Sequence, residues 1–211
     1  MRKGFLIPIW YIFLVTGGKI NIMKVQSNKK TQHKLPSANI LIAQGFWQDD
    51  IYNRAVVLIF DHDEHGSTGI ILNKTNQLQV NAIFPHLNIN NTIYYGGPFG
   101  DDSIGFIHDY HSLKDAIPIG EGLYWCGDIY DVKKRIENNT MDANRIKFFT
   151  GFVQWAPGQL YGEIKQNKWW INTLNINDIL KVDFTALWAY SLIKGGNVYG
   201  LMHGLADPLL N

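Results

Sequence analysis

The stretch that decides the fold runs from Ala55 to Asn73 and reads AVVLIFDHDEHGSTGIILN. It contains a continuous apolar run, 55–60, and a second strand-like run, 68–73, separated by the polar connection 61–67. Short apolar runs bounded by turn residues are typical of buried β-strands. The connection carries Asp and Gly, which favour a hairpin loop. The two strands are therefore predicted to pair antiparallel.

Further short elements surround this hairpin. Strand-like runs occupy 40–43, 92–95, 104–108, 122–126 and 146–153, and 169–171 is interpreted as a strand or a buried turn. One helical turn is expected within 48–54, and helices are predicted from Leu78 up to Pro85, over 128–138, from Pro157 through Ile164, and over 184–194. The sequence contains no fixed-period repeat and no low-complexity linker. The pattern predicts one α+β domain.

Composition narrows the class of protein. The chain has 211 residues, of which 46% are hydrophobic, so it is long enough to bury a full core. Its 19 Lys and Arg residues balance 18 Asp and Glu residues, which gives a formal net charge of +1. Binding to a phosphate backbone needs a clustered excess of positive charge, so direct nucleic-acid binding is disfavoured. The single cysteine, Cys126, excludes an intrachain disulfide and favours a cytoplasmic location.

The first 35 residues differ from the rest. Residues 5–16 form an apolar run behind two basic residues, which outlines a secretory signal. The run is shorter than the roughly 20 residues of a membrane span, and Pro8 interrupts it. Met23 then opens a polar stretch typical of a solvated tail. We interpret 1–35 as an extension, either a mis-called start or a disordered tail, and 36–211 as the domain. Membrane association is expected only if 5–16 is a genuine signal or anchor.

The cluster from His62 to His65 has the residue types of a zinc or iron site. Its two histidines lie three residues apart in a predicted loop, whereas a zincin helix spaces them four apart. His108 and His111 would add ligands only if the fold brings them close. A solvated loop is therefore favoured, and neither a metal nor a cofactor is predicted.

Nucleophilic catalysis has little support in the sequence. The Gly-Ser-Thr-Gly run at 66–69 lacks the pattern of a nucleophile elbow and lies between predicted antiparallel strands. Cys126 precedes a helix start at Asp128, where the helix N-terminus would lower the pKa of the thiol. A buried, inert cysteine is the favoured alternative. No catalytic residue is predicted.

The segment 151–164, GFVQWAPGQLYGEI, predicts a strand that runs through a turn into a helix. Trp155, Gln159 and Glu163 would surround that turn with an aromatic face, an amide and a carboxylate. This combination suits a small polar ligand or an anion. The alternative is structural, because Trp155 would equally well cap the core.

Four sequence blocks share the order and residues of a known family. They are YxRAVV at 52–57, HDxxGxxGIILNK at 62–74, GGP at 96–98 and GFxxWxxGQL at 151–160. In these blocks the chain resembles the AlgH/YqgE family of bacterial proteins, and 122–128 and 207–211 are most similar to its Bacteroidetes members. The resemblance implies one α+β domain with a strongly bent, partly closed, mostly antiparallel β-sheet flanked by helices. It implies no established reaction, although one member is described as a regulator of exopolysaccharide gene expression.

The chain departs from the family pattern in three places. Gln154 and Cys126 stand where glycines are usual, and Tyr161-Gly162 replaces an acidic pair. Any acidic role would therefore fall to Glu163 alone. Gly162 also places a flexible residue inside a predicted helix, at a cost of about 1 kcal/mol relative to alanine.

The resulting hypothesis is a cytosolic, non-enzymatic binding or regulatory domain that acts through a small ligand or a protein partner. Two alternatives stay open: a hydrolase that uses His62, Asp63 and Glu163 with a metal or water, and a direct DNA-binding regulator. The candidate ligand-binding residues are Arg54, His62, Asn73, Gly96, Gly97, Pro98, Trp155, Gln159 and Glu163.

Overall fold

The computed structural model describes residues 11–16, 19–24, 39–44, 51–120 and 122–196. The strands are β1 (Tyr11–Thr16), β2 (Lys19–Lys24), β3 (Asn39–Ala43), β4 (Val56–Asp63), β5 (Gly66–Ile71), β6 (Thr75–Gln79), β7 (Thr92–Tyr95), β8 (Phe99–His108), β9 (Ile117–Gly120), β10 (Leu123–Trp125), β11 (Ile146–Trp155) and β12 (Trp169–Thr173). The α-helices are α1 (Val80–Ile83), α2 (Ile129–Glu137), α3 (Gln159–Lys165), α4 (Ile176–Lys181) and α5 (Leu187–Lys194), and Pro85–Leu87 (η1) and Ala143–Arg145 (η2) are short 3₁₀ helices.

These strands join into one sheet. Its main path runs β12-β3-β4-β5-β11-β8-β1-β2, with β7 and β6 attached beside β11, and β10 and β9 beside β8. The β7–β11 pair is parallel, and the other described pairs are antiparallel. The path starts at β12 and ends at β2, so the described strands do not close into a ring. The predicted single α+β domain with a mostly antiparallel, incompletely closed sheet is confirmed.

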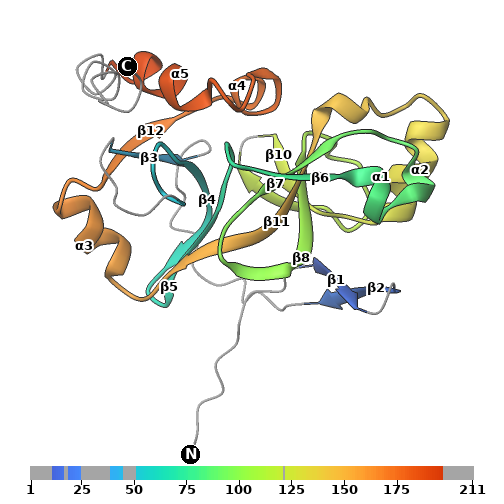
Figure 1. Ribbon diagram of the computed structural model, residues 1–211, viewed down its shortest axis with the longest axis horizontal. Coiled ribbons are helices and arrows are strands. Elements are labelled where there is room, and N and C mark those ends of the chain that lie inside the picture. The colour runs from blue at the N-terminus through green and yellow to red at the C-terminus, as the bar shows by residue number, and fades with distance from the viewer. Residues whose placement is uncertain (1–10, 17–18, 25–38, 45–50, 121, 197–211) are drawn as a thin grey trace, which may run out of the picture.

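Strand β11 links the two halves of the molecule. Figure 1 shows it running between one half that holds β3, β4, β5 and β12 with α3, α4 and α5, and another that holds β6 to β10 with α1 and α2. Its first part pairs with β7 and β8, and Val153–Trp155 pair with β5. The register shifts between Thr150 and Phe152, and Gly151 between them has a φ of +65°. A bulge with a left-handed glycine bends a strand, which lets one strand serve both halves.

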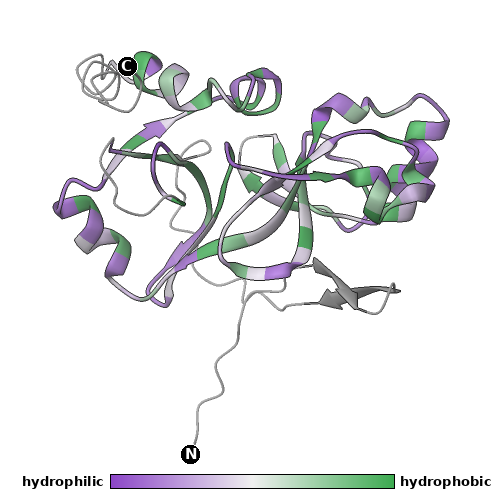
Figure 2. Ribbon diagram, in the orientation of Figure 1, coloured by the Kyte–Doolittle hydropathy of each residue, from purple (hydrophilic) through white to green (hydrophobic). Residues whose placement is uncertain are grey.

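Both faces of β4 are buried from Val56 to Ile59, which explains the continuous apolar run there. Val56 and Leu58 point into the larger core, with Phe106 and Phe148. Val57 and Ile59 point into a smaller core on the opposite face. Because neighbouring residues of a strand face opposite sides, burial of both sides requires apolar residues at every position. The hydropathy colours of Figure 2 follow this pattern along the strands at the centre of the molecule.

Helix α2 begins and ends as its sequence predicts. The Asp128 carboxylate accepts hydrogen bonds from the backbone N–H groups of Tyr130, at 2.9 Å, and Asp131, at 3.4 Å. An N-cap carboxylate of this kind satisfies amides that the helix itself cannot pair. Ile129 and Val132 are buried against the larger core, and the helix ends at Glu137.

Several element boundaries were predicted wrongly. The hairpin connection is much shorter than 61–67, because β4 continues to Asp63 and β5 begins at Gly66. Leu78 lies in β6 rather than in a helix, and α1 covers only Val80–Ile83. Residues 51–54 form a turn rather than a helical turn, and 48–50 lie outside the described residues. Strand β8 starts at Phe99, five residues before the predicted run at Ile104, and α5 starts at Leu187 rather than at 184.

The sequence did not predict β9 or α4. Strand β9 is short and alternates half-buried with exposed residues, and its IPIG sequence contains a proline. Helix α4 has only six residues, although Asn175 and Asp178 form a capping box at its start. Short elements that depend on tertiary packing carry a weak periodic signal.

The predicted N-terminal extension, 1–35, includes β1 and β2. These strands pair with each other, and Phe13 and Leu14 of β1 pair with Ile104 and Ser103 of β8. The rest of that range, like the C-terminal segment 207–211, lies outside the described residues. The boundary at residue 35 stays a prediction. Within the part of the chain that the structure describes, no helix is long and apolar enough to cross a membrane.

Candidate functional site

Two of the predicted segments meet at one place. The tip of the β4–β5 hairpin packs against the turn between β11 and α3, and Ser67 lies opposite Trp155 in the antiparallel register. Gly66 approaches this turn so closely that a Cβ there would lie 2.4 Å from the carbonyl oxygen of Trp155. Only glycine fits that position, which has a φ of +139°. We call this place the hairpin corner and define it by His62, Gly66, Ser67, Trp155, Gln159 and Glu163.

The base of the hairpin corner is a pair of tryptophans held by one carboxylate. Glu163 Oε2 accepts the indole N–H of Trp155 at 2.9 Å and that of Trp169 at 2.8 Å. The two rings are buried and meet edge to face, with centroids 6.1 Å apart. Hydrogen bonds to an ionised acceptor are stronger than neutral ones, so the two rings are held in fixed positions.

Gln159 extends this network to the surface. Its Nε2 donates to Glu163 Oε1 at 3.0 Å, and its Oε1 accepts the backbone N–H of Ala156 at 3.0 Å. Ala156 and the three residues after it are exposed. The turn before α3 is therefore fixed from below and open to solvent above.

The rim of the hairpin corner comes from the β4–β5 hairpin. His62 Nδ1 lies 2.7 Å from the hydroxyl oxygen of Ser67, which is only 6% exposed. The next three residues, Asp63 to His65, are exposed. Just inside this rim, burial raises the pKa of Asp61, and the negative charge of Asp63 adds to that rise, while His62 opposes it. The rim thus offers imidazole and carboxylate groups above a rigid aromatic base.

Arg54 and Asn73 lie at the other end of β4. Asn73 Oδ1 accepts the backbone N–H of Val56 at 2.8 Å, and its Nδ2 donates to the carbonyl of Arg54 at 2.8 Å. The Arg54 guanidinium lies over the ring of Trp188, 5.4 Å from its centroid. Asn73 therefore joins the start of β4 to the end of β5. The two residues predicted as polar anchors are near each other but apart from His62.

The Gly96-Gly97-Pro98 turn packs against the bulge of β11. A Cβ on Gly96 would lie 2.3 Å from the carbonyl oxygen of Gly151, and one on Gly97 would lie 2.3 Å from Phe152. Gly96 also donates its N–H to the carbonyl of Thr150 at 2.7 Å. These glycines allow two backbones to cross in close contact. The turn contacts β11 at Gly151, four residues before Trp155, and the close contacts of Gly96 and Gly97 involve no residue of the hairpin corner.

The described part of the chain contains neither a group of metal ligands nor an exposed thiol. No group of three or more His, Cys, Asp or Glu residues there is placed to hold a metal ion. Cys126 is fully buried, and burial raises the pKa of its thiol to about 12. This burial agrees with the favoured interpretation of a buried cysteine, and the loss of solvent raises the pKa of the thiol rather than lowering it.

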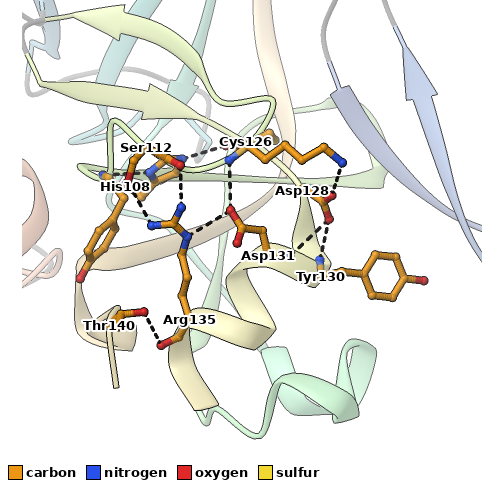
Figure 3. A network of polar contacts seen from close by, with 10 residues as sticks. His108, Ser112, Cys126, Asp128, Tyr130, Asp131, Arg135 and Thr140 are labelled. Carbon is orange, nitrogen blue, oxygen red and sulfur yellow. Dashed lines mark hydrogen bonds and ion pairs between the residues drawn. The ribbon is translucent and has the colours of Figure 1, made fainter. Parts of the chain in front are cut away.

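A second polar network surrounds the start of α2, and most of its contacts were not predicted from the sequence (Figure 3). Lys114 Nζ lies 2.9 Å from Asp128 Oδ2, and Arg135 Nε lies 3.0 Å from Asp131 Oδ2. Arg135 also donates to the carbonyl of Ser112 at 2.6 Å. These bonds join the 109–116 loop to α2. Only the N-cap at Asp128 was predicted: Lys114 and Ser112 are distant in sequence from their partners, and the local i,i+4 pair of Asp131 and Arg135 was missed.

Comparisons with known proteins agree with this fold. The profile of a family described as AlgH-like matches residues 40–199. A UPF0301 protein of Parabacteroides distasonis is 38% identical over 201 residues, which cover 90% of this chain and 98% of that protein. A UPF0301 protein of Bacteroides fragilis is 36% identical over 85% of this chain and 91% of its own length.

Two solved structures share the architecture. The solution structure of the AlgH protein from Pseudomonas aeruginosa superposes with a TM-score of 0.63 at 20% identity, over 83% of this chain and 96% of that one. A crystal structure of a Corynebacterium diphtheriae protein gives a TM-score of 0.61 at 20% identity, over 78% and 95% of the two chains. The bent mixed sheet and its helices define a single α+β domain of known architecture. The chain belongs to the AlgH-like family.

Proposed function

We propose that this protein is a non-enzymatic binding module that acts through the hairpin corner. The observation that carries the proposal is the carboxylate of Glu163, which fixes Trp155 and Trp169 beneath an exposed polar rim. Loops held on a rigid scaffold are where binding groups usually lie. A site that is held rigid from below also binds at a lower entropic cost than a mobile one. The occupant is a small polar ligand or a polar segment of a protein partner.

The same network disfavours general acid or base chemistry by Glu163. Its two oxygens already accept three hydrogen bonds from Trp155, Trp169 and Gln159. A general base must reach the proton that it abstracts, so it needs an oxygen directed at the substrate. Glu163 is directed into the protein. This argues against the hydrolase alternative that combines Glu163 with His62 and Asp63.

We propose further that the protein works in the cytoplasm and that any effect on gene expression passes through its partner. The chain carries a net charge of +1, which supplies little of the counterion release that drives direct DNA binding. Its one cysteine is a buried free thiol, as suits a reducing compartment. Direct DNA binding would require a duplex affinity that falls steeply with salt.

A quantitative affinity purification tests the binding proposal. The full chain and the double variant His62→Ala, Gln159→Ala are captured at equal levels from the native host, and co-purifying proteins and metabolites are measured by mass spectrometry. A binding module predicts a partner or ligand that the double variant loses. The control variant His111→Ala, Asn144→Ala alters two exposed residues outside the hairpin corner and is expected to retain it. Equal recovery in all three samples would contradict the proposal.

One contact favours a second candidate function. The 2.7 Å separation of Ser67 Oγ and His62 Nδ1 is the distance expected between a nucleophile and its base. Burial of Ser67 restricts substrate access, which is why hydrolysis ranks second. Labelling with a fluorophosphonate probe tests whether Ser67 is an activated nucleophile. Stoichiometric labelling that is lost in both Ser67→Ala and His62→Ala would establish an activated serine, and the absence of labelling would remove this candidate.

A further inference from the structure

A completely buried histidine occupies the end of β8, far from the hairpin corner. His108 is 0% exposed and lies between β10 and β11, opposite Tyr124 in one register and Ile146 in the other. Its Nδ1 accepts the backbone N–H of Tyr110 at 3.1 Å, and its Nε2 lies 2.8 Å from the carbonyl oxygen of Cys126. An amide N–H can only donate and a carbonyl can only accept. The ring is therefore neutral, with its proton on Nε2.

Aromatic rings enclose the imidazole. Tyr124 stacks on it with a centroid distance of 5.7 Å, and Tyr110 and Phe106 lie at 6.4 and 5.6 Å. Figure 3 shows His108 beside Cys126, at the point where the chain turns towards Asp128 and α2. A charged imidazolium in this apolar surrounding would lose most of its hydration.

The ionisable groups around His108 come from each element packed against it. Burial lowers the pKa of His108 from its usual 6.5, and the positive charge of Arg135 on α2 acts in the same direction. The hydrogen bond to the carbonyl of Cys126 and the charge of Asp109 oppose that shift. Asp109 is itself paired with Arg145, whose Nε lies 2.6 Å from Asp109 Oδ2. The other ionisable groups near His108 are the side chains of Tyr110, Tyr124 and Cys126.

The two bonds of His108 hold a larger structure together. The loop 109–116 is joined to His108 through the amide of Tyr110, and the Tyr110 hydroxyl accepts the backbone N–H of Asp142 at 2.6 Å. On the other side, Asp128 donates its backbone N–H to the carbonyl of Lys114 at 2.8 Å, directly after the Cys126 segment. Losing the bond between His108 and Tyr110 would release the Tyr110 end of the loop, which packs on Gly127 through Leu113, while the bonds of Lys114 and Arg135 keep its far end joined to α2.

We propose that His108 is a proton-operated latch. Uptake of a proton at Nδ1 replaces an acceptor with a donor that faces the N–H of Tyr110. The hydrogen bond becomes a repulsion, the loop 109–116 moves away from β8 at its Tyr110 end, and the Cys126 thiol becomes accessible to solvent. The protein would thus convert mild acidification into exposure of its single, otherwise inert, cysteine.

The labelling rate of the Cys126 thiol measures how often this segment is exposed to solvent. Labelling of Cys126 in the full chain with dithiodipyridine is followed from neutral pH down to pH 5, and each rate is divided by that of free cysteine at the same pH. Below the usual histidine pKa of 6.5, linkage makes the open state up to about tenfold more populated per pH unit. Circular dichroism in the same buffers reports whether the fold as a whole persists.

Two variants separate the latch from general acid effects. His108→Gln places a neutral amide at this position and is expected to give a corrected labelling rate that does not change with pH. His111→Gln removes an exposed histidine three residues away and is expected to keep the full acid dependence. An unchanged slope in His108→Gln, a flat profile in the unmodified chain, or a rise that coincides with loss of the circular dichroism signal would overturn the proposal.

Amide hydrogen exchange of the unmodified chain gives a second readout that needs no folded variant. The latch predicts that the amides of Tyr110 and Cys126 lose protection below pH 6.5 while that of Leu58, in the larger core, keeps it. Exchange rates must first be corrected for the intrinsic effect of pH. A uniform loss of protection at all three amides would reject the latch and indicate global unfolding.

Discussion

Glu163 Oε2 lies 2.9 Å from the indole nitrogen of Trp155, and the carboxylate thereby connects α3 to the end of β11. The same oxygen accepts the indole N–H of Trp169 on β12. One side chain thus joins three elements beneath the hairpin corner. The sequence predicted Trp155 and Glu163 as ligand contacts, but not Trp169. Their geometry gives at least Glu163 a structural role, which the binding proposal uses as the support of the site.

Replacing this carboxylate should destabilise the protein markedly. Glu163→Ala leaves two buried indole donors without an acceptor, and we expect a loss of about 3 kcal/mol in the free energy of unfolding. Urea denaturation measures it. The control Glu137→Ala removes an exposed carboxylate whose ion pair with Lys133 is worth less than about 1 kcal/mol. Equal losses in the two variants would show that the tryptophan network contributes nothing.

Replacing Gly162, in contrast, is expected to stabilise the protein. This glycine lies within α3, and a Cβ there would meet no atom within 4 Å. Alanine is the better helix former, so Gly162→Ala should stabilise the protein by up to about 1 kcal/mol. Gly96→Ala is the matched comparison, because its Cβ would lie 2.3 Å from Gly151 and should destabilise the fold. Thermal unfolding of the two variants checks both signs, and a destabilised Gly162→Ala would contradict the open space around that position.

Asp61 gives a pH-dependent prediction. Burial and the nearby charge of Asp63 raise its pKa above the usual 3.8, so the folded state holds the proton more tightly than the unfolded state. The stability that Asp61 adds is fully present below pH 3.8 and is lost as the pH rises through the raised value. Asp61→Asn should therefore be more stable than the unmodified chain at pH 7, by a fraction of a kcal/mol because the group is partly solvated.

Urea denaturation at pH 7 and near pH 3.5 measures this effect. The advantage of Asp61→Asn should disappear at the lower pH. Asp102→Asn removes a charge from an exposed position and serves as the control. A stability difference that is the same at both pH values would show that protonation of Asp61 is not its cause.

Local signals predicted the hairpin and the N-cap of α2 because both depend on neighbouring residues. The antiparallel pairing of β4 and β5 followed from two apolar runs and a polar connection, and Asp128 caps the helix that it precedes. The length of the connection between the two strands was overestimated. Polar residues at the end of a strand resemble a loop in the sequence when that end of the strand faces solvent. His62 and Asp63 are exposed, yet they belong to β4.

Features that join distant segments were not predicted from the sequence. The bend in β11 depends on Gly151 meeting Gly97, residues 54 positions apart, and a motif of glycines alone does not say which backbone they approach. His108 was weighed as a metal ligand because its residue type was visible and its burial was not. The resemblance to a known family predicted the fold where local signals did not, because family members share the long-range contacts. It gave no such help for the site.

Native mass spectrometry of the full chain, purified gently from its own host, tests the binding proposal most directly. We predict a retained mass, either a small molecule or a protein partner, that is lost in His62→Ala and in Gln159→Ala and kept in His111→Ala. The retained mass would also identify the occupant. A chain that carries no additional mass, or a retained mass that all three variants keep, would contradict binding at the hairpin corner.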